Sequence, residues 1–184
     1  MNDNAKLEGL EIRELETQEY ERLADIDRTE TIRIGYRMTD GSLERMDVDW
    51  DTPRWFPAGD EHSVSRLVKF LHEHAERGAI ALGAFDGERL AGIAMWQPDI
   101  AEGMDQLAFL HVSAGYRRHG IASELCDRLE ALARSNGART FYVSATPSGS
   151  AVGFYRSRGF RPTATPDPEL FALEPEDIHM TKPL

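Results

Sequence analysis

Two hydrophobic periodicities alternate along the first third of the chain. Over 9–15 and 31–50 apolar residues stand near every second position, as in a strand with one buried face. Within the second segment Asp40-Gly41 interrupts the alternation, and this dipeptide favours the tight turn of a β-hairpin. Between the two segments, apolar residues over Thr17–Ile26 recur at helical spacing, and we expect a helix capped by its first residue. A loop over Pro53–Pro57 follows the hairpin.

The rest of the chain predicts a regular alternation of strands and helices. A helix begins after Ser63 and stops at Gly78, and a hairpin turning at Asp86-Gly87 follows over 79–96. The remaining predicted elements are strands at Gln106–Val112, Phe141–Ala145 and Ile178–Leu184 and helices at Ile121–Ser135 and Val152–Ser157. This order predicts an α/β (α+β) protein, in which helices flank a mixed, mostly antiparallel sheet on both sides.

Length and charge limit the class of protein. With 184 residues the chain can form one domain that buries roughly two thirds of its unfolded surface. Its net charge of −11 argues against nucleic-acid binding, which depends on neutralising phosphates. The same charge leaves room for a cationic substrate, although an acidic surface also serves solubility alone.

Cysteine usage and the N-terminus bear on the compartment. The single cysteine, Cys126, lies in an apolar helical pattern, which predicts core packing and fits a reducing compartment. The polar N-terminus lacks the order of a signal peptide, and no apolar run approaches the about 18 residues of a membrane span. We therefore expect a cytoplasmic protein without a membrane or nucleic-acid partner, and a homodimer stays open.

The turn Arg117–Ala122 lies where an apolar strand pattern gives way to a helical one. Unpaired N–H groups in the first turn of a helix point outward, and the helix dipole adds partial positive charge. A glycine, here Gly120, lets an anion approach the backbone. The turn is therefore suited to a phosphate group, although many strand–helix turns carry Arg and Gly for geometry alone.

The sequence from Val112 to Ala122 resembles the acyl-CoA signature of the GNAT family of N-acetyltransferases. Arg117, Gly120 and Ala122 stand at the family's Arg/Gln-x-x-Gly-x-Gly/Ala positions. Arg118 replaces a common glycine, and its side chain either pairs with a phosphate or points to solvent. The resemblance implies the GNAT fold and acetyl-CoA as co-substrate, with its pyrophosphate on the backbone amides. It implies cofactor contacts at Leu110, Val112, Arg117, Arg118, His119, Gly120, Ile121, Ala122, Ser123 and Ser148.

A second motif supports the same resemblance. Ala151, Tyr155, Gly159 and Phe160 match the family's Asn-x-x-Ala-x-x-x-Tyr-x-x-x-Gly-Phe pattern, and Ser148 replaces its asparagine. The resemblance implies that Tyr155 is the general acid that protonates the CoA thiolate, a transfer compatible with ordinary phenol and thiol pKa values. A lone helical tyrosine outside such a pattern usually packs in the core. The resemblance further implies that the strand ending at Val112 parts from the next parallel strand, where the pantetheine binds free backbone groups and a backbone N–H such as that of Val112 faces the thioester oxygen.

The general base is harder to identify. Many relatives carry a glutamate on the strand before the turn, whereas this strand contains only His111, with Asp105 just before it. An imidazole titrates near neutrality and suits base chemistry, so we rank His111 first, although a strand histidine also serves as a packing residue. The other five histidines are scattered and do not indicate a metal site: His62, His72, His74, His119 and His179.

Substrate selection is assigned to the N-terminal part of a single domain spanning 1–184. We divide it into a variable substrate side, 1–78, and an acetyl-CoA-binding core, 79–184. The first part offers aromatic residues beside carboxylates, a combination that suits a cationic amine: Tyr36, Trp50, Trp55 and Phe56 beside Asp47, Asp49, Asp51 and Asp60. The alternative is a solvated hairpin whose aromatics cover the core.

The resulting expectation is an N-acetyltransferase acting on a small basic amine. Two alternatives stay open: a catalytically silent acyl-CoA-binding module, and an enzyme that acetylates protein N-termini or lysines. The missing strand carboxylate keeps the first alternative open, whereas Tyr155 favours an enzyme.

Overall fold

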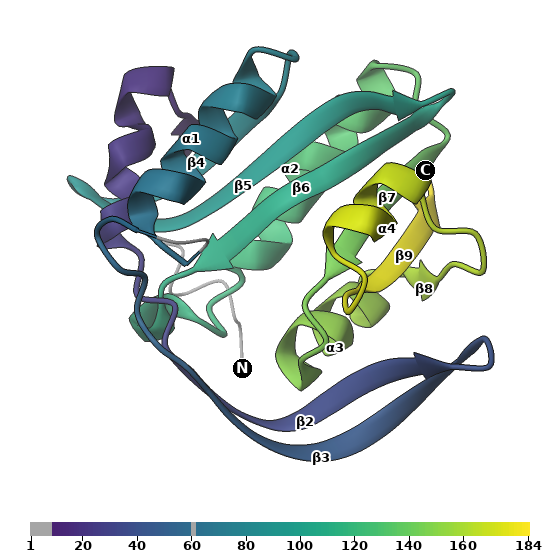
Figure 1. Ribbon diagram of the computed structural model, residues 1–184. Helices are drawn as coiled ribbons and strands as arrows, with labels where there is room; N and C mark the ends of the chain where they lie inside the picture. Colours follow the sequence, from purple (N-terminus) through teal and green to yellow (C-terminus); the bar gives the residue numbers. More distant parts are fainter. Residues whose placement is uncertain (1–8, 60–61) are drawn as a thin grey trace.

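A seven-stranded sheet forms the centre of the computed structural model, which describes residues 9–59 and 62–184 (Figure 1). The strand order is β1-β4-β5-β6-β7-β9-β8, and a separate two-stranded sheet pairs β2 with β3. All pairings are antiparallel except β6 with β7. This architecture confirms the predicted mixed, mostly antiparallel sheet.

The elements follow the predicted order with small shifts at their ends. The strands are β1 (Leu10–Glu14), β2 (Glu30–Thr39), β3 (Ser42–Thr52), β4 (Ile80–Asp86), β5 (Arg89–Ala101), β6 (Met104–Val112), β7 (Thr140–Ala145), β8 (Arg161–Pro162) and β9 (Ile178–Pro183). The helices are η2 (Thr17–Asp25), α1 (Val64–Ala75), η3 (Ala114–Tyr116), α2 (Ile121–Ser135), α3 (Gly149–Ser157) and α4 (Pro168–Leu173). Within the described residues, no helix has the length and apolarity to cross a membrane.

Helices cover both faces of the sheet, as the sequence predicts. On one face α2 and α3 pack on the strands through residues such as Leu125 and Val152. On the other face η2 and α1 pack through Leu23 and Leu71, which are fully buried. Cys126 of α2 is also fully buried, in agreement with its predicted packing role. Burial and the nearby Glu130 carboxylate raise the pKa of its thiol to about 11.

The central strands β6 and β7 part soon after they meet. Their parallel pairing covers three positions only, Met104 to Gln106 of β6 against Thr140 to Tyr142 of β7. From there to Val112, β6 pairs with β5 alone. The second half of β6 therefore presents an open edge toward β7, as the predicted splay requires.

The β2–β3 hairpin curves away from the main sheet and passes beneath α3 (Figure 1). Asp40 and Gly41 have φ angles of 49° and 77°, which fit the predicted tight turn. The Tyr36 N–H donates to the Pro147 carbonyl at 2.9 Å, just before α3. The hairpin therefore lies against the segment that leads into α3, far from its own place in the sequence.

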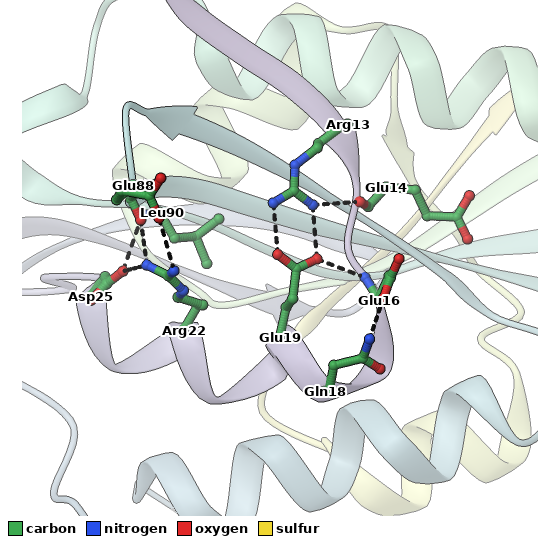
Figure 2. A network of polar contacts seen from close by, with 9 residues as sticks. All are labelled: Arg13, Glu14, Glu16, Gln18, Glu19, Arg22, Asp25, Glu88 and Leu90. Carbon is green, nitrogen blue, oxygen red and sulfur yellow. Dashed lines mark hydrogen bonds and ion pairs between the residues drawn. The ribbon is translucent and has the colours of Figure 1, made fainter.

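The first predicted helix differs in type and in its cap. It is a 3-10 helix, and Glu16 rather than Thr17 forms its N-cap. Figure 2 shows the cause: the Glu19 carboxylate accepts from the Glu16 N–H and from the Arg13 guanidinium of β1. The prediction was wrong here because an ion pair with Arg13 of the preceding strand fixes Glu19 in the capping position. The same Arg13 contact lowers the pKa of Glu19 to about 2.

Three short elements were not predicted from the sequence: η3, β8 and α4. α4 begins at Pro168 after Asp167, whose carboxylate accepts from the Glu169 and Leu170 N–H groups. α3 contains the predicted helical residues Val152 to Ser157 and begins at Gly149, because the Ser148 hydroxyl caps it by accepting from the Ala151 N–H at 3.2 Å.

Candidate active site

A cavity of about 850 Å³ opens where β6 parts from β7. The hairpin base, the N-terminus of α2, α3 and the segment after α4 complete its walls. All the site residues predicted from the sequence line it except His119. His119 borders a second cavity of about 290 Å³, which shares Tyr116 and Ile121 with the first.

The turn before α2 has the backbone shape of an anion-binding nest. Arg118 and Gly120 adopt left-handed φ angles of 63° and 83°. Within the described part of the chain, no backbone carbonyl accepts from the N–H groups of Arg118, Gly120, Ile121, Ala122 or Ser123. Together with the dipole of the 15-residue helix α2, these donors suit a pyrophosphate.

Arg118 and Arg117 differ in what their guanidinium groups contact. Arg118 is exposed, lines the cavity and pairs with no acceptor among the described residues. Its left-handed backbone explains why glycine is the easier residue at this position.

Arg117 turns in the opposite direction, toward the base of the hairpin. Its Nε donates to the Val112 carbonyl at 3.1 Å, and its terminal nitrogens donate to the carbonyls of Arg28 and Thr29 at 3.1 and 3.0 Å. It also forms an ion pair of 3.6 Å with Glu30. The side chain of Arg117 therefore ties the turn to the start of β2.

The second half of β6 offers unpaired backbone groups to the cavity. The Ser113 N–H donates to the Ala91 carbonyl of β5 at 2.8 Å. Because backbone groups alternate in an antiparallel ladder, those of Val112 and Leu110 point the other way, toward the splay. The Val112 carbonyl is taken by Arg117, which leaves its N–H directed to the opening.

Tyr155 lines the cavity from α3 and is only 7% exposed. Its ring packs edge-on against Phe154 and Phe160, with ring centroids 5.3 and 5.6 Å apart. Among the described residues its hydroxyl has no hydrogen-bond partner. Burial, with a smaller contribution from the Cys126 thiol and the Asp177 carboxylate, raises the pKa of this phenol above its ordinary value, so it keeps its proton at neutral pH. The Ser148 hydroxyl, by contrast, is engaged in capping α3.

His111 also lines the cavity, but its surroundings suppress protonation. Desolvation, aided by the positive charges of Arg28 and Arg117, lowers the pKa of His111 to about 3. Its ring packs against Trp55 and Phe109, with centroids 4.8 and 4.7 Å away. Such a ring is neutral at physiological pH and is a weak proton acceptor.

The other candidate on this strand, Asp105, lies inside β6 rather than before it. It is fully buried and accepts from the Trp96 indole N–H and the Asp99 N–H, both at 2.9 Å. Asp105 is not among the residues lining the cavity. Its carboxylate therefore holds the β5–β6 turn together.

The aromatic and acidic residues of the hairpin do not gather at the cavity. Asp47 and Asp49 lie in solvent paired with Arg45 and Arg33, while Trp55 is buried in the core at 8% exposure. Of the predicted carboxylates that the structure describes, Asp51 lines the cavity, and Asp60 lies outside the described residues. Trp50 and Phe56 are exposed, and Tyr36 packs at the margin of the core.

Three further carboxylates reach the cavity without any signal in the sequence spacing: Glu30, Glu174 and Asp177. Glu30 stands at the start of β2, and the other two follow α4, more than 140 residues later. The sheet order places β9 beside β7 and so brings Glu174 and Asp177 to the opening, whereas the contacts of Arg117 hold the start of β2, with Glu30, at the same opening. Among residues 9–59 and 62–184, no three His, Cys, Asp or Glu side chains lie close enough to hold a metal ion.

Comparison with known proteins links this geometry to one family. Residues 45–160 match the acetyltransferase (GNAT) family. The amino-acid acetyltransferase of Azotobacter vinelandii (strain DJ / ATCC BAA-1303) is 34% identical over 99 residues, which are 53% of this chain and 22% of that protein. The chain thus spans about a fifth of the length of this relative.

Solved structures share the fold at low sequence identity. Nourseothricin acetyltransferase superposes with a TM-score of 0.71 at 20% identity, covering 95% of this chain and 98% of the other. The ribosomal-protein-S18-alanine N-acetyltransferase of Escherichia coli superposes with a TM-score of 0.59 at 17% identity, covering 95% and 93%. These likenesses agree with the sheet order and the predicted fold.

Proposed function

Because this chain belongs to the acetyltransferase (GNAT) family, whose enzymes take the acetyl group from acetyl-CoA, we propose that it acetylates a small basic amine. The observation that carries the proposal is one cavity that joins the anion-binding turn, Tyr155 and four carboxylates. The turn suits the cofactor, the phenol suits the leaving thiolate, and the carboxylates suit a cationic acceptor. The carboxylates are Glu30, Asp51, Glu174 and Asp177.

The cofactor residues act through the backbone rather than through side chains. The N–H groups from Arg118 to Ser123 would receive the pyrophosphate, and the exposed Arg118 guanidinium would add a charge-assisted contact. Along the open half of β6, the free groups of Leu110 and Val112 would bind the pantetheine amides as an added strand does.

The reaction needs a donor for the thioester oxygen and an acid for the leaving sulfur. The Val112 N–H, directed into the splay, is the donor that we assign to the oxygen, where negative charge develops during attack. Tyr155 is the acid that we assign to the sulfur, because it stays protonated at neutral pH and its hydroxyl has no protein partner within the described residues. The pKa of His111 makes it unsuited to accept a proton from an ammonium group, so we assign it a packing role instead.

The first part of the chain supports the substrate class. Glu30, Asp51 and Thr52 line the cavity from the two ends of the hairpin. Within residues 1–78, the base of the hairpin is therefore the part that we assign to acceptor selection, and the residues from 79 onward to the acetyl-CoA core.

A thiol-release assay on a panel of amines tests the proposal. We expect acetyl-CoA-dependent turnover of small amines that carry positive charge, and slower turnover of neutral or acidic amines and of peptides. A matched pair of variants adds a control: Asp51→Asn should raise the KM of the amine, whereas Asp49→Asn, in an exposed residue of the same strand that does not line the cavity, should leave it unchanged. Binding of acetyl-CoA without turnover of any amine would instead favour the silent acyl-CoA-binding module.

A further inference from the structure

The segment Glu174–Asp177 connects α4 to β9 and forms one wall of the cavity. Figure 1 shows α4 lying over β7 and β9, above α3. The Asp177 N–H donates to the Glu174 carbonyl at 3.1 Å, and a His179 ring nitrogen donates to the same carbonyl at 3.0 Å. The backbone of the segment is thus fixed, and both carboxylates border the space that Tyr155 lines.

Asp177 and Glu174 differ in burial. Asp177 is half-buried, whereas Glu174 is exposed, and both line the cavity. The titratable groups that face Asp177 are Glu174 from its own segment and Tyr155 from α3, and His179 of β9 acts on Glu174. Asp177 and Tyr155 line the same cavity, Asp177 from the segment after α4 and Tyr155 from α3.

We propose that Asp177 is the general base that deprotonates the acceptor ammonium, with Glu174 as the neighbouring charge that adjusts its basicity; this inference rests on the proposed function. β6, the strand from which many relatives supply a glutamate, supplies no carboxylate to the cavity. A carboxylate on another wall of the cavity that the proposed acid lines takes its place. The acceptor is accordingly an amine that arrives as a cation and is neutralised only inside the cavity.

The protons balance around one catalytic cycle. Asp177 takes a proton from the ammonium, and the neutral nitrogen attacks the thioester carbon, so that a carbon–nitrogen bond forms and the carbon–sulfur bond breaks. The departing thiolate takes the Tyr155 proton. The second proton of the nitrogen returns to Tyr155, and the proton held by Asp177 passes to solvent through the open cavity. One ammonium and one thioester thus give one amide, one thiol and one released proton.

The ionisation of Asp177 makes this inference measurable. Desolvation, with a smaller contribution from the Glu174 charge, raises the pKa of Asp177 to about 7. The carboxylate accepts protons only in its ionised form, so kcat/KM for the amine should rise with pH through about 7. This rise should stay at the same pH for amines of different basicity, because it belongs to the enzyme.

Two variants and a control test the assignment in the whole chain. Asp177→Asn should lower kcat roughly 100-fold and abolish the rise near neutral pH, with acetyl-CoA affinity unchanged. Glu174→Gln should move the rise to lower pH, because removing a neighbouring negative charge lowers the pKa of Asp177. Glu176→Gln, an exposed residue of the same segment that does not line the cavity, should leave the profile unchanged.

The outcomes separate this inference from the function on which it rests. Failure of the wild type to acetylate any amine, despite binding acetyl-CoA, overturns both. Wild-type turnover together with an unchanged pH profile in Asp177→Asn overturns the assignment of Asp177 alone. Where Asp177→Asn does not fold, the Glu174→Gln profile decides: a shift to lower pH supports the assignment, and no shift overturns it.

Discussion

Replacing Tyr155 by phenylalanine removes one hydroxyl and leaves the aromatic packing of α3 in place. The ring keeps its edge-on contacts with Phe154 and Phe160 at 5.3 and 5.6 Å. Since the hydroxyl bonds to no described residue, its loss should change the free energy of unfolding by less than about 1 kcal/mol. The cost to catalysis should be much larger, because a positioned general acid contributes about 10²–10⁴-fold to the rate, or roughly 3–5 kcal/mol of barrier.

The measurement compares turnover, binding and stability in the same variant. We expect kcat from thiol release to fall by about 10²-fold or more, while the acetyl-CoA dissociation constant from calorimetry and the melting temperature stay close to those of the wild type. Tyr20→Phe is the matched control, because Tyr20 is equally buried, at 2% exposure, but packs in the core on the opposite face of the sheet. An unchanged kcat in Tyr155→Phe would refute the general-acid assignment. An equal loss of acetyl-CoA affinity would show that the hydroxyl binds rather than protonates.

Three further predictions concern the cofactor turn and its surroundings. Gly92→Ala would place a Cβ atom 2.8 Å from Cγ2 of the buried Ile121, so the start of α2 must shift. We expect the free energy of unfolding, measured with denaturant, to fall by about 1–3 kcal/mol and the KM for acetyl-CoA to rise. Arg118→Gly relieves a left-handed backbone but makes the unfolded chain more flexible, so the free energy of unfolding should change by less than about 1 kcal/mol. The KM for acetyl-CoA should rise, and an unchanged KM would mean that Arg118 does not contact the phosphates. His111 should remain neutral in an NMR titration from pH 8 to 5, because burial lowers its pKa to about 3, and titration near pH 6.5 would contradict the described burial. Since only the unfolded chain binds a proton at this histidine, the free energy of unfolding should fall as the pH drops below about 6.5.

Local signals in the sequence were enough to define most elements of this fold. Capping by Ser63 and the left-handed stop at Gly78 bound α1, and the turn residues Asp40-Gly41 join the hairpin, because each signal acts within a few residues. The bounds of α2, Ile121–Ser135, agree with the prediction for the same reason. By contrast, the cap of η2 depends on Arg13 of another element, and it was wrongly predicted.

The candidate site likewise contains some features that local sequence signals predict and others that depend on contacts between distant segments. A backbone-based cofactor turn and a motif tyrosine can be found from spacing, because one strand–helix junction and one helix supply them. The direction of the Arg117 guanidinium could not be predicted, since the acceptors of its two terminal nitrogens lie almost 90 residues away, just before β2. Nor could the neutral state of His111, which arises from packing against Trp55 and Phe109.

The sequence by itself determined the mixed sheet, the glycine-containing turn before α2 and the place of Tyr155 on α3. Only the tertiary structure decided which carboxylates reach the acceptor side. The splay of β6 from β7 opens the cavity, and the return of β9 beside β7 brings Glu174 and Asp177 to it. The Arg117 contacts hold Glu30 there, whereas Asp47 and Asp49 of the hairpin remain in solvent. The turn before α2 is formed by consecutive residues, so its backbone shape can be predicted locally. The carboxylates of the cavity come from segments that are distant in the sequence, and only the packing of the fold brings them close together.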